Sequence, residues 1–443
     1  MKIENYKLKI CYNIFRKIYC REKSKMGLFS FIKPKADNKT QKHYLAMDLG
    51  TEVVKCLVIK NVFTDHKGYI VGTGKQSLPT NSNLAGQILD IHAYVDTIQS
   101  AIEKAVTLSG LKPNDVIAGI SGPKIINQIN RQTFTRSKPH QKITTEELQI
   151  IFRQVENQSK KTLRSLQTTG KNQDQLELVN AAMLKIMIDG VEVQNPLGFT
   201  GRDLDITYFV SYAPSIQLNA LQSVIDECKL NLVSIINEPY SLLKSIDAGN
   251  HFYKNSLFID IGGDLTNIGL IQDGQISHVG SFQSGGRQFT NILAENLSIS
   301  FKKAEQYKLD YSHNLMSEET EQEFKSLFLP QSEKWLSTLL DYLNNLELDL
   351  NVSQIFVCGG GSLLPEIKSL LKNKLSPQKI FKANSDLHYL KPTDLENIID
   401  KTTYIKSSSQ IVPLSLGKIG LKFSAYDNPF EKMIKKLMQT LRT

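Results

Sequence analysis

The stretch "YLAMDLGTEVVKCLVI" occupies residues 44–59, and "SLFIDIGGDLTNIGLI" at residues 256–271 repeats its pattern. Each stretch has an apolar run, an Asp, an apolar residue, a Gly and a small or charged turn, followed by a second apolar run. This pattern predicts a β-hairpin whose turn carries Asp and Gly. A third strand is predicted after each hairpin, at "YIVGTG" and "ISHVGSF". Two such units followed by helical patterns predict an α/β protein with two similar halves.

Other segments predict the elements that join these units. Thr144 and Glu147 form a capping box before an apolar stripe at helical spacing. The polar stretch "SKKTLRSLQTTGKNQDQLE" (159–177) predicts an exposed loop, and "IFVCGGGSLLPEI" (355–367) predicts a strand, a glycine turn and a helix.

The charge is concentrated at the two ends of the chain. The formal net charge is +9; residues 1–42 contribute 12 − 3 = +9 and residues 429–443 contribute 4 − 1 = +3, which leaves −3 for residues 43–428. This distribution argues against a nucleic-acid-binding face on the body and favours ends that meet something anionic. The five cysteines form no CxxC pair, so a zinc site or a disulfide framework is not expected. Met26 is an alternative start within a basic N-terminal extension.

Three glycine turns carry the chemistry. Backbone N–H groups at a tight glycine turn can approach phosphates closely, and a nearby carboxylate can hold a divalent cation. The two hairpin turns supply both features, and Gly359, Gly360 and Gly361 form a third turn on which a flat base could lie. One Asp-x-Gly turn alone is more often an ordinary β-turn. Two copies at domain spacing and a late strand–Gly–Gly–Gly–helix predict a nucleotide cleft.

The order of these motifs resembles the actin, Hsp70 and sugar-kinase superfamily, whose fold is ribonuclease H-like. The hairpin turns are similar to its phosphate-1 and phosphate-2 loops, and "VCGGGS" to its adenosine loop. "INEPYSLL" (236–243) looks like its connecting helix, which would place Glu238 near the metal and the attacking water as the catalytic residue. "SISFKKAEQYKLDYS" resembles the segment whose Glu and Lys meet the nucleoside; the alternative is that Glu305 and Lys308 form a surface i,i+3 pair.

The resemblance implies ATP and Mg²⁺ as cofactors, with Asp48 and Asp260 at the metal. The cofactor-binding residues that it implies are Asp48, Gly50, Thr51, Lys55, Asp260, Gly262, Gly263, Thr266, Glu305, Lys308, Gly359, Gly360 and Gly361.

A narrower resemblance is to the bacterial cell-division family FtsA. It rests on "IDGVEVQNPLGFTGRDLDITYFVSYAP" (188–214), with an NP-x-G-x-x-G segment, and on the end of the chain. It implies an inserted α+β domain, 1C or SHS2-like. The predicted organisation is an N-terminal extension at 1–42, a first half at 43–116 and 206–245, domain 1C at 117–205, a second half at 246–425 with a 2B region at about 295–350, and a terminal helix at 426–443.

The terminal segment "NPFEKMIKKLMQTLRT" (428–443) has an apolar stripe at helical spacing beside lysines. A C-terminal helix docked on the core of the same chain is one interpretation. The FtsA resemblance favours the other, a helix lying on an anionic membrane surface. The residues implied at the membrane are Phe430, Met433, Ile434, Lys435, Lys436, Leu437, Met438 and Leu441.

The second hairpin turn departs from the superfamily pattern. Asp264 stands where a Gly is usual beside the phosphates, Leu265 lacks a hydroxyl, and Asn267 replaces an acid that could orient other groups. A further carboxylate repels a triphosphate unless it helps to ligate Mg²⁺ or points away. ATP binding with at most weak ATPase activity is therefore expected.

The FtsA resemblance implies an adaptor on the cytoplasmic face of the membrane at the division septum. Its partners would be the FtsZ C-terminal peptide, copies of itself in an actin-like filament, anionic lipids and other division proteins, but no nucleic acid. A PilM-like platform of the type IV pilus is the alternative, because the start "MGLFSFIKPK" and the region after "INEP" resemble PilM as much. A small-molecule kinase is a third hypothesis, for which no motif supplies the catalytic base.

Overall fold

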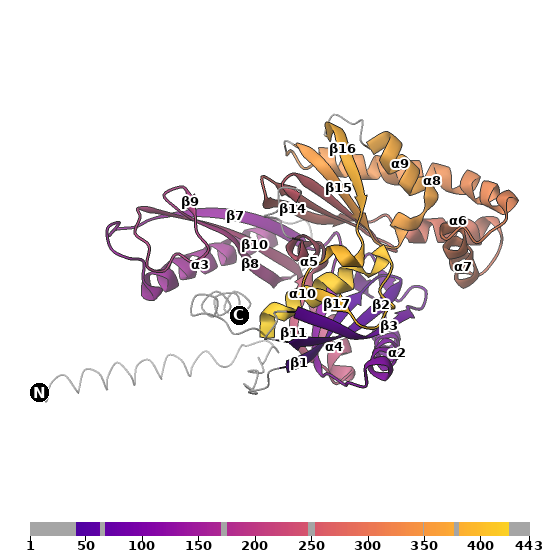
Figure 1. Ribbon diagram of the computed structural model, residues 1–443, viewed down its shortest axis with the longest axis horizontal. Helices are drawn as coiled ribbons and strands as arrows, with labels where there is room; N and C mark the ends of the chain where they lie inside the picture. The colour runs from indigo at the N-terminus through magenta and orange to yellow at the C-terminus, as the bar shows by residue number, and fades with distance from the viewer. Residues whose placement is uncertain are drawn as a thin grey trace, which may run out of the picture. The chain divides into compact units, whose positions relative to one another are not determined.

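A computed structural model describes residues 41–62, 67–169, 175–246, 253–348, 350–375 and 381–424 (Figure 1). Residues 1–40 of the predicted N-terminal extension and the whole predicted terminal helix lie outside these residues, as do all eight residues implied at the membrane; residues 41 and 42 begin the first strand. Over the part of the chain that is described, no helix is both long enough and apolar enough to cross a lipid bilayer.

The first sheet has six strands in the order β11-β6-β1-β2-β3-β17. Its elements are β1 (Gln41–Leu49), β2 (Val53–Val62), β3 (Lys67–Ser77), β6 (Asp115–Ile120), β11 (Asn231–Asn237) and β17 (Ile398–Asp400). The hairpin β1–β2 is antiparallel, as predicted, and β1 also pairs in parallel with β6. Between β3 and β6 lie the short pair β4 (Asn83–Leu84) and β5 (Gln87–Ile88) and the helix α2 (Ile91–Ser109), which contacts β2 and β3.

The second sheet has the order β14-β13-β12-β15-β16. Its strands are β12 (Ser256–Ile261), β13 (Thr266–Gln272), β14 (Gln275–Phe282), β15 (Val352–Cys358) and β16 (Phe381–Tyr389). Strand β12 pairs antiparallel with β13 and in parallel with β15, so β12 repeats the pairing of β1. This confirms the two predicted hairpins and their third strands. The helices of this half are α6 (Gly286–Asn296), α7 (Phe301–Ser312), α8 (Glu318–Asn344) and α9 (Pro365–Leu370).

A four-stranded antiparallel sheet, β7-β10-β8-β9, lies in the chain between β6 and the helix α4 (Ser215–Glu227). It comprises β7 (Ile126–Thr135), β8 (Leu176–Ile188), β9 (Val191–Glu192) and β10 (Asp203–Pro214), with the helix α3 (Thr145–Thr169) packed on it (Figure 1). The predicted boundaries 117 and 205 of the inserted domain fall inside strands. β6 belongs to the first sheet because it pairs with β1, and β10 continues to Pro214 because it pairs with β8 up to that residue.

The prediction of an exposed loop from residue 159 is wrong for residues 159–169, which continue α3. The helix has Phe152, Val155, Ser159 and Leu163 at three- and four-residue spacing, and Leu163 packs against the core that the others line or adjoin. The apolar stripe therefore persists into the polar stretch.

One buried arginine organises the NP-x-G-x-x-G segment. Arg136, whose side chain is 1% exposed, makes two hydrogen bonds to the carboxylate of Glu147, of 2.7 and 2.9 Å. The same guanidinium donates to the carbonyl oxygens of Gly201 (2.7 Å) and Gln141 (2.9 Å). Gly198 has φ +84°, a conformation that favours glycine.

The chain returns to the first half at its end, which differs from the predicted second half at 246–425. β17 pairs with β3, and α10 (Ile411–Ser424) packs against β1, β2 and the helix α5 (Glu238–Ser245) (Figure 1). Tyr44 on β1 donates a hydrogen bond of 2.6 Å to the carbonyl of Gly417. A Cβ at Gly420 would lie 2.6 Å from Ile117, so the helix approaches the sheet closely only because a glycine faces it.

Candidate functional site

The first hairpin places an ion pair at its turn. Asp48 is the last but one residue of β1 and stands directly opposite Lys55 on β2, and the Lys55 Nζ lies 2.8 Å from Asp48 Oδ2. The Asp48 side chain is only 5% exposed and that of Lys55 24%. Because cross-strand partners point to the same face of a hairpin, the strand register itself brings the two charges together.

Three carboxyl groups act on the charge of this lysine. Burial opposes the charge of Lys55, yet the carboxyl groups of Asp48, Asp260 and Glu238 raise its pKa above the ordinary value. Burial and the Asp48 carboxylate in turn raise the pKa of Glu238 to about 8. Burial also raises the pKa of Asp260, against the opposing effect of a hydrogen bond from Asn267. Three of the predicted site residues thus act electrostatically on the ammonium group of a fourth, Lys55.

Glu238 is fixed by groups from three elements. It begins α5, where Asn237 caps the helix by accepting a hydrogen bond of 3.0 Å from the Tyr240 N–H. The Ser121 hydroxyl donates to Glu238 Oε2 at 2.6 Å. Asn237 also donates to Asn127 Oδ1 on β7 at 3.1 Å, so a strand of the inserted sheet supports the cap. A carboxyl group with a raised pKa in a fixed position is suited to exchange a proton with a neighbouring group.

The second hairpin holds Asp260 in a matching place. Asn267 on β13 donates to Asp260 Oδ2 at 2.9 Å, and Ser281 fixes that amide with a hydrogen bond of 2.7 Å to its Oδ1. Asn267 therefore orients Asp260 by donation, a role that an acid at this position could fill only in its protonated form.

The two hairpin turns touch each other directly. The backbone N–H of Asp264 donates to Thr51 Oγ1 at 2.9 Å. The Asp264 carboxylate accepts a hydrogen bond of 2.8 Å from the N–H of Ala85, in the turn between β4 and β5. The unusual carboxylate is thus held by a backbone donor. Of the two neighbouring glycines, Gly263 lies against Glu52, and the N–H of Gly262 closes the turn onto the Leu265 carbonyl (2.8 Å).

Thr266 is predicted to bind the cofactor, but its hydroxyl is used in contacts inside the second half. Its hydroxyl donates to the Ser284 carbonyl (2.7 Å) and accepts a hydrogen bond of 3.0 Å from the Trp335 indole N–H, and the residue is fully buried. Both partners belong to the second half. The hydroxyl is therefore engaged in packing this half, and we do not retain Thr266 as a ligand.

The third glycine turn follows β15. Gly359 has φ +88°, which favours glycine, and the Ser362 hydroxyl donates to its carbonyl at 2.7 Å. A Cβ built on Gly360 would meet no other heavy atom within 4 Å, whereas Gly361 packs against Ile261 at the end of β12. One backbone position of this turn, Gly360, is thus open for a flat group to lie against.

Glu305 and Lys308 do not form a surface pair. Lys308 is 7% exposed, and its Nζ donates to Glu305 Oε2 (2.7 Å), Thr290 Oγ1 (2.9 Å) and the Gly286 carbonyl (3.1 Å). The pair therefore fastens α7 to the first turn of α6. It lies beside the second hairpin turn because the N–H of Gly286 donates to the Gly262 carbonyl at 3.0 Å.

The sequence interpretation missed the segment Gly285–Gly286–Arg287. The Arg287 N–H donates to the Gly263 carbonyl at 2.7 Å, and a Cβ at Gly285 would lie 2.8 Å from the Gly262 carbonyl oxygen. The Arg287 side chain forms an ion pair with Glu52 and donates to the Thr51 carbonyl at 3.0 Å. The signal was a Gly-Gly pair directly before a helix, which is typical of a loop whose backbone must approach another backbone.

The oxygen donors of the site fit a magnesium–nucleotide complex, but the Lys55 ammonium already lies beside one of the two carboxylates. Asp48 and Asp260 provide carboxylate oxygens, the ligands that Mg²⁺ prefers. Over the described residues, no three His, Cys, Asp or Glu side chains cluster as a metal centre. In this structure the ammonium of Lys55 supplies the positive charge beside Asp48. A magnesium ion would therefore be held by few protein ligands and keep much of its water shell, as is usual for this ion.

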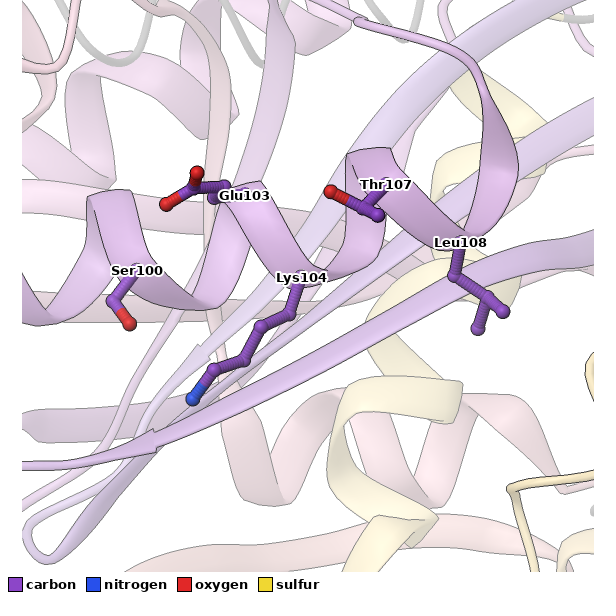
Figure 2. A pocket seen from close by; sticks show the side chains of 5 residues that line it. All are labelled: Ser100, Glu103, Lys104, Thr107 and Leu108. Atoms are coloured by element: carbon purple, nitrogen blue, oxygen red, sulfur yellow. The ribbon is translucent and has the colours of Figure 1, made fainter.

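A separate cavity of about 550 Å³ lies on α2 (Figure 2). Its walls are side chains of Ser100, Glu103, Lys104, Thr107 and Leu108, all from that one helix. None of the site residues lines it, and it is an open surface depression on one helix. We therefore place the candidate site at the three glycine turns.

Comparison with known proteins first defines the class. The structure superposes on a chain of the PilM–PilN type IV pilus biogenesis complex with a TM-score of 0.62 and 14% identity, covering 85% of this chain and 98% of that one. The protein has a mixed α/β fold of the actin-like ATPase class, as the sequence predicted.

The particular relatives are cell-division proteins, and the chain is similar to FtsA. The family model described as Cell division protein FtsA matches residues 257–405. The FtsA of Neisseria meningitidis is 27% identical over 272 residues, which cover 61% of this chain and 62% of that protein. That of Enterococcus hirae is 23% identical over 401 residues, covering 84% and 85%. The matches to the Neisseria and Bacillus subtilis proteins span 62% and 66% of those relatives. The predicted resemblance is confirmed.

Proposed function

We propose that this chain binds ATP between its two hairpin turns. The observation that carries the proposal is the ammonium of Lys55 among the carboxyl groups of Asp48, Asp260 and Glu238. Such a group of desolvated charges is costly to maintain and is typical of a functional site. Gly50, Gly262 and Gly263 would cradle the phosphates, and the base would lie along Gly359, Gly360 and Gly361, with Glu305 and Lys308 at the nucleoside. Bound Mg²⁺ would neutralise phosphate charge.

The chain's own residues favour binding over rapid hydrolysis. Asp264 places a further carboxylate, held by the N–H of Ala85, in the turn that would meet the phosphates. That charge opposes a triphosphate, and Leu265 offers no hydroxyl to the site. The nucleotide would therefore act mainly as a ligand that stabilises one arrangement of the two halves, with at most weak ATPase activity.

The role that we propose for this nucleotide-binding protein is that of a division adaptor. It would assemble into an actin-like filament on the cytoplasmic face of the membrane, bind the FtsZ C-terminal peptide at the 2B region, and recruit later division proteins at the septum. The similarity to proteins named Cell division protein FtsA supports the proposal. The segment 430–441 would bind anionic lipids through its apolar stripe and lysines. A single such helix is a weak anchor, which a filament strengthens by avidity.

A reconstitution tests the adaptor role with the full chain. The protein is mixed with ATP, a labelled FtsZ C-terminal peptide and vesicles that contain an anionic phospholipid, and the vesicles are then floated. We expect the protein and the peptide to float together, and both to stay behind with vesicles of neutral lipid alone. Failure of the protein to float would contradict the membrane role, and floating without the FtsZ peptide would contradict the role as an FtsZ tether.

The pilus platform is a second candidate because the PilM chain in a PilM–PilN complex has a TM-score of 0.62. A labelled PilN N-terminal peptide in a parallel flotation distinguishes the two. Recovery of the PilN peptide alone would replace the division role with a pilus role. Recovery of neither peptide would leave the actin-like fold without either assignment.

Replacing Gly360 with valine tests where the nucleotide lies. Gly360 has φ −66°, and an added Cβ meets no other heavy atom within 4 Å, so the folded protein should accept the side chain. We expect the affinity for a fluorescent ATP analogue to fall by about tenfold or more, because the side chain occupies the face proposed for the base. Gly360→Ala, with a smaller group, should have an intermediate effect. An unchanged affinity of the valine variant, with an unchanged unfolding midpoint, would exclude this turn as the nucleoside site.

A further inference from the structure

An ion pair spans the two hairpin units at the point where their turns meet. Glu52 follows Thr51 in the first turn, and Arg287 is the second residue of α6 in the second half. The Glu52 carboxylate and the Arg287 guanidinium are paired, with side chains 18% and 15% exposed. Over the described residues, Glu52 Oε1 and Arg287 Nε have no hydrogen-bond partner besides this pairing. The Glu52 carboxylate thus holds the Arg287 guanidinium at the turns, and each of the two paired atoms has the other as its partner.

The carboxylate of Glu52 lies in the proposed nucleotide site. Its side chain packs on Gly263, one of the proposed phosphate-binding residues. It also interacts electrostatically with Glu305 and Lys308, the proposed nucleoside contacts. Burial raises the pKa of Glu52, whereas Arg287 lowers it. Arg287 is therefore the main group that stabilises a carboxylate at this place.

Arg287 has the geometry of an anion-binding residue. Its backbone N–H bonds to the Gly263 carbonyl, and its Nη2 donates to the Thr51 carbonyl at 3.0 Å, so both hairpin turns position it. Phe301 lies 5.9 Å from the guanidinium carbon, measured to the ring centroid, and supports its plane. A planar guanidinium binds carboxylate and phosphate oxygens in the same way, through parallel N–H donors. One anion can thus replace the other without rebuilding the site.

We propose that Arg287 is a phosphate ligand of the bound nucleotide and that the Glu52 carboxylate occupies it until the nucleotide displaces it. Glu52 is then an internal competitor that weakens nucleotide binding and holds the turns against each other when no nucleotide is bound. The inference rests on the proposed ATP binding and adds to it a ligand and a competing residue. Competition for Arg287 also accounts for the carboxylate of Glu52 at this place, because a carboxylate beside a triphosphate otherwise only repels it.

The test compares Glu52→Gln with the unmodified full chain in titrations with a fluorescent ATP analogue and Mg²⁺. Glutamine keeps the shape of the side chain but is uncharged, so the competition for Arg287 weakens. We expect the dissociation constant to fall by about tenfold. Glu103→Gln, on the exposed face of α2, removes the same charge far from the pair and should leave the affinity unchanged. If Glu52→Gln binds the ATP analogue no more tightly than the unmodified chain, Glu52 does not compete with the nucleotide for Arg287.

A second variant tests the ligand separately. Arg287→Lys retains the positive charge but loses the parallel donors, and we expect the dissociation constant to rise about tenfold. In the double variant the effect of Glu52→Gln should be smaller than in the Arg287 background, because the competitor acts through Arg287 and pairs less well with a lysine. If Arg287→Lys binds as tightly as the unmodified chain, Arg287 is not a ligand. If the unmodified chain and all variants bind no nucleotide, the ATP proposal itself fails; binding by the unmodified chain without these changes refutes only the inference.

Discussion

Replacing Lys55 with methionine is expected to lower the free energy of unfolding by about 3 kcal/mol and to abolish nucleotide binding. The substitution removes the ammonium that lies 2.8 Å from Asp48 and interacts electrostatically with Asp260 and Glu238, so the buried Asp48 carboxylate loses its partner. Methionine fills a similar volume, so the loss reports on charge more than on packing. The magnitude is at the low end for a buried pair because the Lys55 side chain is 24% exposed, so water partly screens the charges.

Lys42→Met provides the matched control for this experiment. Lys42 lies on the neighbouring strand β1 and pairs with Asp115 at the same distance, 2.8 Å, but its side chain is 39% exposed. Screening by water should keep the loss below about 1 kcal/mol. Denaturant unfolding of both variants and binding of a fluorescent ATP analogue give the two results. Equal losses of stability in the two variants would show that the carboxyl groups around Lys55 do not form the coupled site described above.

Replacing Arg136 with alanine is expected to destabilise the inserted four-stranded sheet by about 3–5 kcal/mol. The guanidinium has a side chain that is 1% exposed, and it holds Glu147 and two backbone carbonyls. Its removal leaves these acceptors without their donor in a buried place. Arg136 is the residue that joins three segments: the loop at 139–141, the N-terminus of α3 and the NP-x-G-x-x-G segment. The substitution removes the hydrogen bonds that join them. We expect hydrogen exchange to accelerate in residues 136–201 before it does in the two larger sheets.

Arg131→Ala is the control, since Arg131 lies on the same strand β7 and pairs with Asp205 at 2.9 Å. Its side chain is 63% exposed, so the expected loss is below about 1 kcal/mol. Comparable acceleration of exchange in both variants would argue that the sheet depends on surface charge and not on the buried guanidinium. Acceleration across all three sheets in Arg136→Ala alone would show that the inserted sheet unfolds together with the rest.

The sequence predicts the elements whose structure depends on residues close together in the chain. The hairpin that joins Asp48 to Lys55 follows from a strand register of a few residues, and Glu238 follows from a capped helix after a strand. Those features appear in the sequence as alternation, caps and glycine turns. The resemblance to a known family supplied their roles.

The features that were missed depend on residues far apart in the chain. Glu52 and Arg287 are separated by 235 positions (287 − 52), and no local pattern marks them as partners. Thr266 was assigned to the site from its motif, but Trp335, 69 residues later, binds its hydroxyl. The polar end of α3 predicts a loop because its charges outnumber its apolar residues, although Leu163 continues the buried stripe. In each case a tertiary contact decides the outcome.

The return of the chain to the first half has a mechanical consequence. Strand β1, which begins at Gln41, and helix α10, which ends at Ser424, pack against each other, and Tyr44 is hydrogen-bonded to Gly417. A force transmitted along the chain from either side therefore enters the same half of the molecule. Tension applied to the two ends would shear α10 against β1 before it reached the turns that hold Lys55 and Asp260.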